Sequence, residues 1–317
     1  MQSEPETALP LRVNDHPTTR PPDHPTTRPP DHPTTRPPVS TPDLAQHLAA
    51  HLTPHLGPAE AASVTRLVME DLFDYRKGQR PRLLSPEEEA RANTTLERLQ
   101  AGEPVQYVTG IADFYDLQLK VTPAVLIPRP ETEELVEWIL EDHAKGTQQM
   151  VADIGTGSGC IPLALKSRRP QWGCQGYDIS TEALAIATDN AMQLDLNCQF
   201  IKGDVLKDSF SLLPTSLDIL ISNPPYIPPS EIDRMGKSTI THEPKLALFA
   251  PEDDPLIFYR RIAALGRKAL KPGGHLYFEM NEYNSEQVVA TLQQGGYTQV
   301  QRRQDLQGKW RMVRATR

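Results

Sequence analysis

The stretch Leu217–Tyr226, which reads L-D-I-L-I-S-N-P-P-Y, places one polar residue and two prolines directly after an apolar run. The apolar residues predict a buried strand, which must end at Pro224 because proline has no N–H to donate to a ladder. Asn223 therefore follows the carboxyl end of a strand, where α/β sheets build their sites. Its amide carries an acceptor and a donor, Pro224 and Pro225 leave their carbonyls free as acceptors, and Tyr226 adds a flat apolar face. The turn suits a planar NH2 group, although an isolated Asn-Pro-Pro is more often an ordinary turn after a strand.

The surrounding sequence alternates strands and helices, which predicts a parallel sheet with helices on both faces. Helices are expected between the strands, for example over Thr181–Leu194 and Leu256–Leu270. The fold class is therefore α/β, with a Rossmann-like, mostly parallel sheet that ends in an antiparallel strand. The predicted strands are Met150–Ile154, Gly173–Asp178, Gln199–Lys202, Asp218–Ser222, Gly274–Met280, and a final pair Thr298–Gln304 and Trp310–Arg314.

The N-terminal part has a different composition. Residues 15–38 repeat one unit, Asp-His-Pro-Thr-Thr-Arg-Pro-Pro, three times. The unit has nothing apolar to bury, and its prolines block helix and ladder alike, so we expect residues 1–42 to be a disordered tail. The histidines of the repeat have no closed ligand geometry, which favours a solvated tail over a metal site.

Residues 43–103 predict a small helical domain. Asp43 is expected to cap its first helix, and a second helix should run over residues 58–73. Ser85, followed by Pro86 and two glutamates, is a strong start signal for a third helix. In the connecting segment 104–124, Val105–Val108 and Phe114–Val121 predict a β-hairpin around Gly110, and residues 125–317 form the main domain.

A glycine-rich turn follows the first predicted strand of the main domain. Asp153–Cys160 reads D-I-G-T-G-S-G-C, with glycines at 155, 157 and 159 that allow a tight turn and close approach of a ligand. Asp178, at the end of the next strand, could accept both hydroxyls of a ribose or could cap the helix after it. Gly203, Asp204 and Val205 follow the third strand, where an adenine could lie. These strand ends share one edge with Asn223 and could hold a nucleoside cofactor.

The charge and the cysteine content of the chain indicate which binding partners and which cellular compartment to expect. The net charge of −8 counts modestly against duplex DNA as a partner. Cys160, Cys174 and Cys198 have neither C-x-x-C nor metal spacing, which predicts reduced, buried residues and no metal. No apolar run reaches the roughly 18 residues of a membrane span, and the N-terminus lacks the apolar segment of a secretory signal. We expect a cytoplasmic protein.

Several further motifs are typical of one class of enzymes. I-P-R-P-E-T-E at Ile127–Glu133 is the most specific of them, whereas N-P-P-Y is shared with adenine-amino methyltransferases of DNA. The others are Pro104–Tyr107, Phe114-Tyr115, Asp153–Cys160, Asp178–Ser180, Asn223–Ile227, Glu243-Pro244, Tyr259-Arg260 and Asp305–Gly308.

With these motifs, the chain resembles class I S-adenosylmethionine (SAM) methyltransferases over roughly residues 44–315. More narrowly, it resembles the release factor glutamine methyltransferases, which methylate the glutamine amide of the Gly-Gly-Gln loop in peptide chain release factors. It departs from that family at Phe249–Pro255, where a Gly-Asp-Gly-Leu turn is more usual, which affects the local loop shape.

The resemblance implies roles for individual residues. Asn223 and the Pro224 carbonyl would hold the substrate amide, next to the cofactor, with Pro225 beside them and Tyr226 packed against the amide. Arg129 and Glu131 would shape the pocket between the domains, although an Arg/Glu pair is also a routine ion pair. The implied cofactor ligands are Gly155, Thr156, Gly157, Ser158 and Gly159 for the methionine part of SAM, Asp178 for its ribose, and Asp204 and Val205 for its adenine; Asn223 is implied as a cofactor contact as well.

The implied activity is methyl transfer from SAM to a release factor by a monomeric enzyme that needs neither a membrane nor nucleic acid. Two enzymes remain as alternatives, a glutamine methyltransferase of a ribosomal protein and an amino-methyltransferase of DNA or RNA. A third alternative is a catalytically silent binding module that keeps the fold, but the intact glycines, Asp178 and N-P-P-Y count against it.

Overall fold

The computed structural model describes residues 39–208, 210 and 213–317. Most of the predicted disordered tail, residues 1–38, lies outside the described residues. Helix α1 (Thr41–Leu56) begins within the last residues that we assigned to that tail. Its N-cap is Ser40 and not Asp43, so that prediction was wrong. Ser40 and Asp43 bond each other's backbone N–H reciprocally, and this capping box satisfies two N–H groups that a helix start would otherwise leave unpaired.

The helical region has its own apolar core. It comprises α1, α2 (Pro58–Phe73), α3 (Pro86–Gln100) and the short α4 (Val105–Thr109). The second and third helices have the predicted starts, and Ser85 caps α3 through a capping box with Glu88. The side chains buried between these helices include Leu48, Leu52, Val68 and Phe73.

The connecting hairpin differs from its prediction. Val105–Val108, predicted as a strand, lies in α4, and the hairpin instead pairs β1 (Ile111–Phe114) with β2 (Leu117–Lys120). Tyr107 and Val108 are both buried although they are adjacent, whereas a strand would point them to opposite faces. The guanidinium of Arg98 also donates to the carbonyls of both residues, which holds this turn in the helical conformation.

The main domain contains the predicted sheet. Its seven strands have the order β5-β4-β3-β6-β7-β9-β8, with parallel pairing from β5 to β7 and antiparallel pairing of β9 with both β7 and β8. This confirms the predicted fold class. The strands are β3 (Met150–Ile154), β4 (Gly173–Asp178), β5 (Cys198–Lys202), β6 (Leu217–Ser222), β7 (Leu270–Glu279), β8 (Thr298–Gln304) and β9 (Trp310–Thr316).

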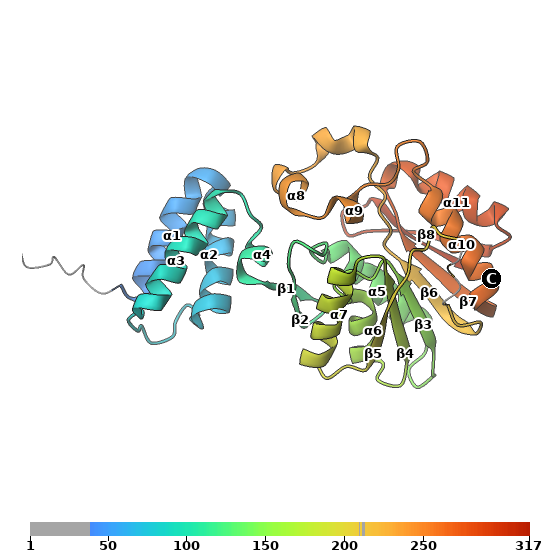
Figure 1. Cartoon of the computed structure of the whole chain (residues 1–317), viewed down its shortest axis with the longest axis horizontal. Helices are drawn as coiled ribbons and strands as arrows, with labels where there is room; N and C mark the ends of the chain where they lie inside the picture. Colours follow the sequence, from blue (N-terminus) through green and yellow to red (C-terminus); the bar gives the residue numbers. More distant parts are fainter. Residues whose placement is uncertain (1–38, 209, 211–212) are drawn as a thin grey trace, which may run out of the picture. The chain divides into compact units, whose positions relative to one another are not determined.

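Helices cover both faces of the sheet (Figure 1). One face packs against α5 (Pro130–Asp142), α6 (Cys160–Arg168) and α7 (Thr181–Gln193), and the other against α10 (Ile257–Ala269) and α11 (Ser285–Gln294). In β6, Ile219 and Ile221 face the α5 side, while Leu220 between them faces the α10 side. Each such fully buried side chain stabilises the fold by about 1.5–3 kcal/mol, so the alternation fixes the register of the central strand.

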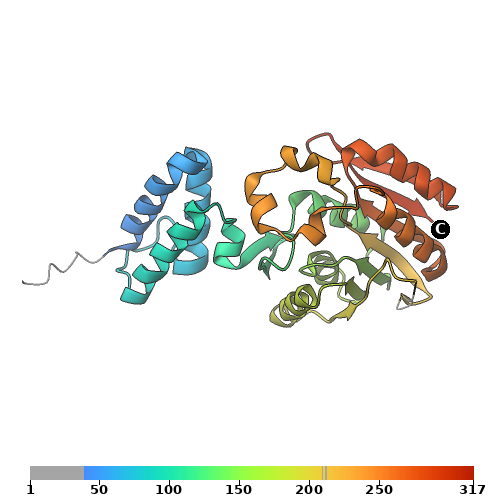
Figure 2. The same ribbon diagram turned by 45° about the horizontal axis from the view of Figure 1, so that its top comes forward.

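A segment of short helices follows Asn223 at the carboxyl edge of the sheet. It contains η1 (Pro229–Arg234), α8 (Lys237–His242) and α9 (Lys245–Leu248), while η2 (Glu282–Asn284) follows β7. Figure 2 shows the orange part with α8 and α9 beside the green segment that leads into α5. The carboxylate of Glu243 joins the two, because it accepts the backbone N–H of Ile127 at 3.2 Å. Across the described part of the chain, no helix is both long and apolar enough to span a membrane.

Candidate active site

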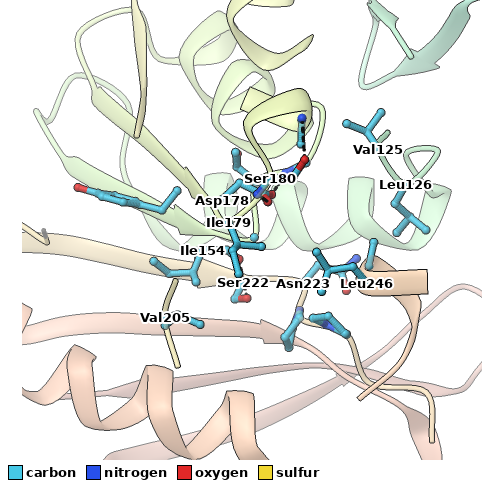
Figure 3. A pocket seen from close by; sticks show the side chains of 18 of the residues that line it. Val125, Leu126, Ile154, Asp178, Ile179, Ser180, Val205, Ser222, Asn223 and Leu246 are labelled. Carbon is cyan, nitrogen blue, oxygen red and sulfur yellow. Dashed lines mark hydrogen bonds between the residues drawn. The ribbon is translucent and has the colours of Figure 1, made fainter. Parts of the chain in front are cut away.

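A cavity of about 490 Å³ opens at the carboxyl edge of the sheet, within the size range of small-molecule sites. Its walls come from the ends of β3, β4 and β6 and from the loops that follow them, as expected for a parallel sheet. Figure 3 shows Asp178 and Asn223 along the cavity, with Leu126 and Leu246 at the Asn223 end. The cavity therefore joins the glycine-rich turn to N-P-P-Y, as the sequence predicted for that edge.

The glycine-rich turn adopts a backbone that other residues rarely adopt. Gly155 and Gly157 have φ of +74° and +55°, in the left-handed region that favours glycine. Gly159, at φ +80°, has no room for a side chain, because a Cβ there would lie 2.9 Å from the Phe200 ring. The turn thus packs tightly against β5 on one side and leaves its backbone open to the cavity on the other.

Asp178 supports this turn and still faces the cavity. One carboxylate oxygen accepts the N–H of Gly157 at 2.9 Å and the other accepts the N–H of Ser180 at 2.9 Å. The helix α7 is capped by Ser180, whose hydroxyl accepts the N–H of Ala183, so Asp178 is not the N-cap. Burial raises the pKa of Asp178, and these backbone N–H groups oppose that effect. A carboxylate has about four lone-pair sites, and these backbone N–H groups do not fill all of them, so the carboxylate can still accept a ligand hydroxyl.

Buried polar atoms without a partner surround the glycine-rich turn. The hydroxyls of Thr156 and Ser158 and both carboxylate oxygens of Asp153 make no hydrogen bond of good geometry among the described residues, although the Thr156 hydroxyl lies close enough to Asp153 to favour its ionised form. Burial raises the pKa of Asp153 to about 7. Buried polar groups without a good hydrogen bond are rare in native proteins, and they mark a place where a polar ligand or a water supplies the missing hydrogen bonds. The residues present therefore fit a polar, zwitterionic group such as the methionine part of SAM.

The opposite end of the cavity has an apolar wall. Val205, Phe210 and Tyr177 line this part of the cavity, and Asp204, which also lines it, accepts the N–H of Leu206 at 3.0 Å. An apolar wall next to a carboxylate suits a nucleoside base. The structure thus brings Asp178, Asp204 and Val205 to one cavity, while their individual ligand roles stay predictions.

Asn223 lies where β6 ends, half-buried in the wall of the cavity, with Pro224 and Pro225 beside it. Its Nδ2 donates to the hydroxyl of Thr132 at 3.3 Å, and within the described residues this is the hydrogen bond that its side chain makes. Its Oδ1 is therefore available as an acceptor. Tyr226 does not line the cavity, and its hydroxyl instead donates to Glu279 at 3.2 Å. Its stacking role remains a prediction.

Arg129 and Glu131, which were expected to shape the pocket together, have different positions relative to the cavity. Arg129 lines the cavity and pairs with Glu243 at 2.5 Å, where the Glu243 side chain is only 1% exposed. Glu131 is not among the residues that line the cavity, and Arg129 takes Glu243 as its partner in its place. The ion pair fastens the I-P-R run to the segment after N-P-P-Y, and so shapes the cavity between them.

Two residues of the site carried no predicted role. Thr132 was part of the I-P-R-P-E-T-E run, and Glu279 was placed inside a buried strand. The available signal was the single charge in the apolar run L-Y-F-E-M at 276–280, because an unpaired charge is almost never buried. Leu126 and Leu246 at the Asn223 end gave no signal, since leucines that are not fully buried are common.

Comparisons with known proteins agree with this geometry. Residues 132–248 match the family model described as Methyltransferase small domain, and residues 44–110 match the PrmC N-terminal domain. The chain is 42% identical over 235 residues to the release factor glutamine methyltransferase of Bacteroides thetaiotaomicron, covering 74% of this chain and 84% of that protein. It is 45% identical over 206 residues to the one of Streptococcus pneumoniae, covering 65% and 71%.

A solved structure with the same fold is the hMettl16 catalytic domain in complex with the MAT2A 3′UTR hairpin 6. Its TM-score is 0.50 at 20% identity, covering 76% of this chain and 85% of that chain. At this identity the likeness concerns the fold alone.

Proposed function

Because this chain belongs to the family of release factor glutamine methyltransferases, we propose that it methylates a glutamine amide with SAM as the methyl donor. The substrate would be the glutamine of the Gly-Gly-Gln motif in peptide chain release factors. The observation that carries this proposal is Asn223, whose amide N–H is used inside the protein while its carbonyl oxygen remains at the cavity wall. We infer that the enzyme acts in the cytoplasm.

The chemical difficulty lies in the substrate. An amide nitrogen is a poor nucleophile because its lone pair is delocalised into the carbonyl, and the peptide rotation barrier of about 18–20 kcal/mol gives the scale of that resonance. SAM, when bound, supplies an electrophilic methyl carbon on a positively charged sulfur, and the bond to that sulfur breaks as the N–C bond forms. The protein must therefore improve and aim the nitrogen.

Asn223 and Pro224 are suited to that task. The Asn223 Oδ1 and the Pro224 carbonyl are two acceptors next to each other, and they would hold the two N–H groups of the substrate amide. Those hydrogens become more acidic as the new N–C bond forms, so the hydrogen bonds to them strengthen in the transition state. Such preorganised contacts lower the barrier, and the fixed direction of the nitrogen supplies the rest. One of the two hydrogens then leaves as a proton to solvent.

The cofactor half of the proposal rests on the other residues of the cavity. The glycine-rich turn, with Thr156 and Ser158 in the wall of the cavity, fits the methionine part of SAM. Asp178 can still accept a ribose hydroxyl, and the apolar wall with Val205 suits the adenine. We further propose that the helical domain over residues 43–103 and the hairpin in the segment 104–124 dock the release factor.

The experiment is transfer of label from methyl-labelled SAM to purified proteins by the full-length chain. The acceptors are a release factor, the same factor with its Gly-Gly-Gln glutamine replaced by alanine, a ribosomal protein fraction, and duplex DNA. The proposal expects label on the intact factor alone. Label on the ribosomal fraction or on DNA, with none on the factor, would replace it with the corresponding alternative.

A further inference from the structure

A buried glutamate stands next to Asn223 at the carboxyl edge of the sheet. Glu279 ends β7, and its neighbour Phe278 is paired with Ser222 of β6, so the two chains reach Glu279 and Asn223 side by side. Glu279 is only 1% exposed. Replacing a buried charge by a well-packed apolar residue is often neutral or stabilising, so the fold alone gives little reason for a carboxylate here.

Three hydrogen bonds connect this carboxylate to the N-P-P-Y turn. The hydroxyl of Thr132 donates to one oxygen of Glu279 at 2.6 Å, and the hydroxyl of Tyr226 donates to the other at 3.2 Å. The Thr132 oxygen in turn accepts the N–H of Asn223 at 3.3 Å. Thr132 lies in the first turn of α5, so the chain Glu279–Thr132–Asn223 links β7, α5 and β6.

The chemistry of these groups sets the direction of every bond. An ionised carboxylate only accepts, so the single hydroxyl hydrogen of Thr132 must point to Glu279. The Thr132 oxygen then faces Asn223 with a lone pair, which selects the NH2 end of the amide. The carbonyl end of Asn223 is left facing the cavity. Without this constraint the amide could turn over and offer N–H groups to a substrate that itself brings N–H groups.

A nearby cation favours the ionised form of Glu279. Arg311 of β9 is paired with Asp305 at 3.2 Å and also acts electrostatically on Glu279. Burial raises the pKa of Glu279, while the hydroxyls of Thr132 and Tyr226 and the charge of Arg311 oppose that rise. This gives the D-L-Q-G motif at Asp305–Gly308 a place in the site, because its aspartate holds the arginine.

We propose that Thr132 and Glu279 are positioning residues that fix which end of the Asn223 amide faces the substrate. The proposal rests on the proposed function, because it assigns the same acceptor role to Asn223. It adds that the hydroxyl of Thr132, in the I-P-R-P-E-T-E run, orients the Asn223 amide. The charge of Glu279 in turn orients that hydroxyl.

The first test compares Thr132→Val with Thr132→Ser. Valine keeps the shape and removes the hydroxyl, so the turnover number on the release factor should fall about ten- to a hundredfold, the scale of an unsatisfied buried polar group. Serine keeps the hydroxyl and should stay within a few-fold of the wild type. The SAM dissociation constant, measured by calorimetry, should be the same in both, which shows that the cavity is intact.

Tyr259→Phe is the matched control. The Tyr259 hydroxyl is buried and donates to the backbone carbonyl of Glu279 at 3.2 Å, so its loss perturbs the same residue outside the proposed chain. Turnover by this variant should stay near that of the wild type. A loss as large as that of Thr132→Val would assign the effect to general packing around Glu279 and overturn the proposal.

A double-mutant cycle supplies a readout that packing alone would not give. Glu279→Gln replaces the acceptor-only group by one that can also donate, so it should lower turnover at least as much as Thr132→Val. If both act in one chain, the double variant should be no slower than Glu279→Gln alone. If the losses of turnover in the two single variants multiply in the double variant, or if Thr132→Val keeps full activity, the proposed chain of hydrogen bonds is refuted. Wild-type inactivity on every release factor would instead refute the proposed function.

Discussion

Replacing Asn223 with alanine should abolish most turnover while leaving the protein folded and able to bind SAM. The variant removes one of the two acceptors proposed for the substrate amide and leaves the Pro224 carbonyl in place. Loss of one preorganised contact of this kind costs about 10²–10³ in the turnover number. The structure limits side effects, because Asn223 is half-buried and Thr132 still donates to Glu279, so no buried donor loses its acceptor.

The assay is single-turnover methyl transfer to a release factor at saturating enzyme, beside calorimetry with SAM. We expect a rate lower by about two to three orders of magnitude, with a SAM dissociation constant within a few-fold of the wild type, because the glycine-rich turn and Asp178 are untouched. An unchanged rate would refute the role of Asn223. A lost affinity for SAM with a normal rate at saturation would make Asn223 a cofactor ligand only.

Three further outcomes follow from the structure. Asp178→Ala should weaken SAM binding by about 1.5–3 kcal/mol in calorimetry, the scale of hydrogen bonds to a charged group, and equal affinity would leave Asp178 only its support of the turn. Arg129→Met leaves the buried Glu243 carboxylate without its cation, so thermal unfolding should show a loss of about 3–5 kcal/mol that Glu243→Gln in the same chain largely restores. Burial lowers the pKa of His143 from 6.5 to about 4, so the unfolded chain binds more protons between these values. The free energy of unfolding should therefore fall by about 2–3 kcal/mol as the pH drops through that window, and denaturant titrations of His143→Phe should lack that part of the slope.

The sheet could be predicted because its signals are local. Met150–Ile154 is mostly apolar, Gly173–Asp178 has strand length and leads into a helix start at Ser180, and both have the predicted bounds. The start of β7 was predicted at Gly274, which is too late, because Leu270 already pairs with Leu217 across a bulge. The resemblance to release factor glutamine methyltransferases, read from the motifs, is confirmed by the relatives.

Failures occurred where a specific contact between side chain and backbone decides the local structure. Val105–Val108 has β-forming residues, but Arg98 binds the carbonyls of Tyr107 and Val108 and favours a helical turn. Ser40 outcompetes Asp43 as a cap because their side chains complete a reciprocal pair. Neither effect is visible from single-residue preferences.

The site was predicted as a set of strand ends, but not as a network. Parallel strands bring Asp178 and Asn223 to one edge whatever their side chains do, so this proximity follows from topology. The bond from Asn223 to Thr132, 91 positions away, and the one from Thr132 to Glu279, 147 positions away, depend on how α5 packs across the sheet. The partner of Arg129 was missed for the same reason, since Glu243 lies 114 positions away.

The most direct measurement is mass spectrometry of a release factor after incubation with this enzyme and SAM. Fragmentation of the peptide with the Gly-Gly-Gln loop identifies the residue that carries the new methyl group, and comparison with a synthetic peptide identifies the atom. The account predicts one methyl group on the side-chain amide nitrogen of the glutamine in that loop, and none when Asn223→Ala replaces the enzyme over the same time. A methyl group on another residue or atom, or equal modification by the variant, would contradict it.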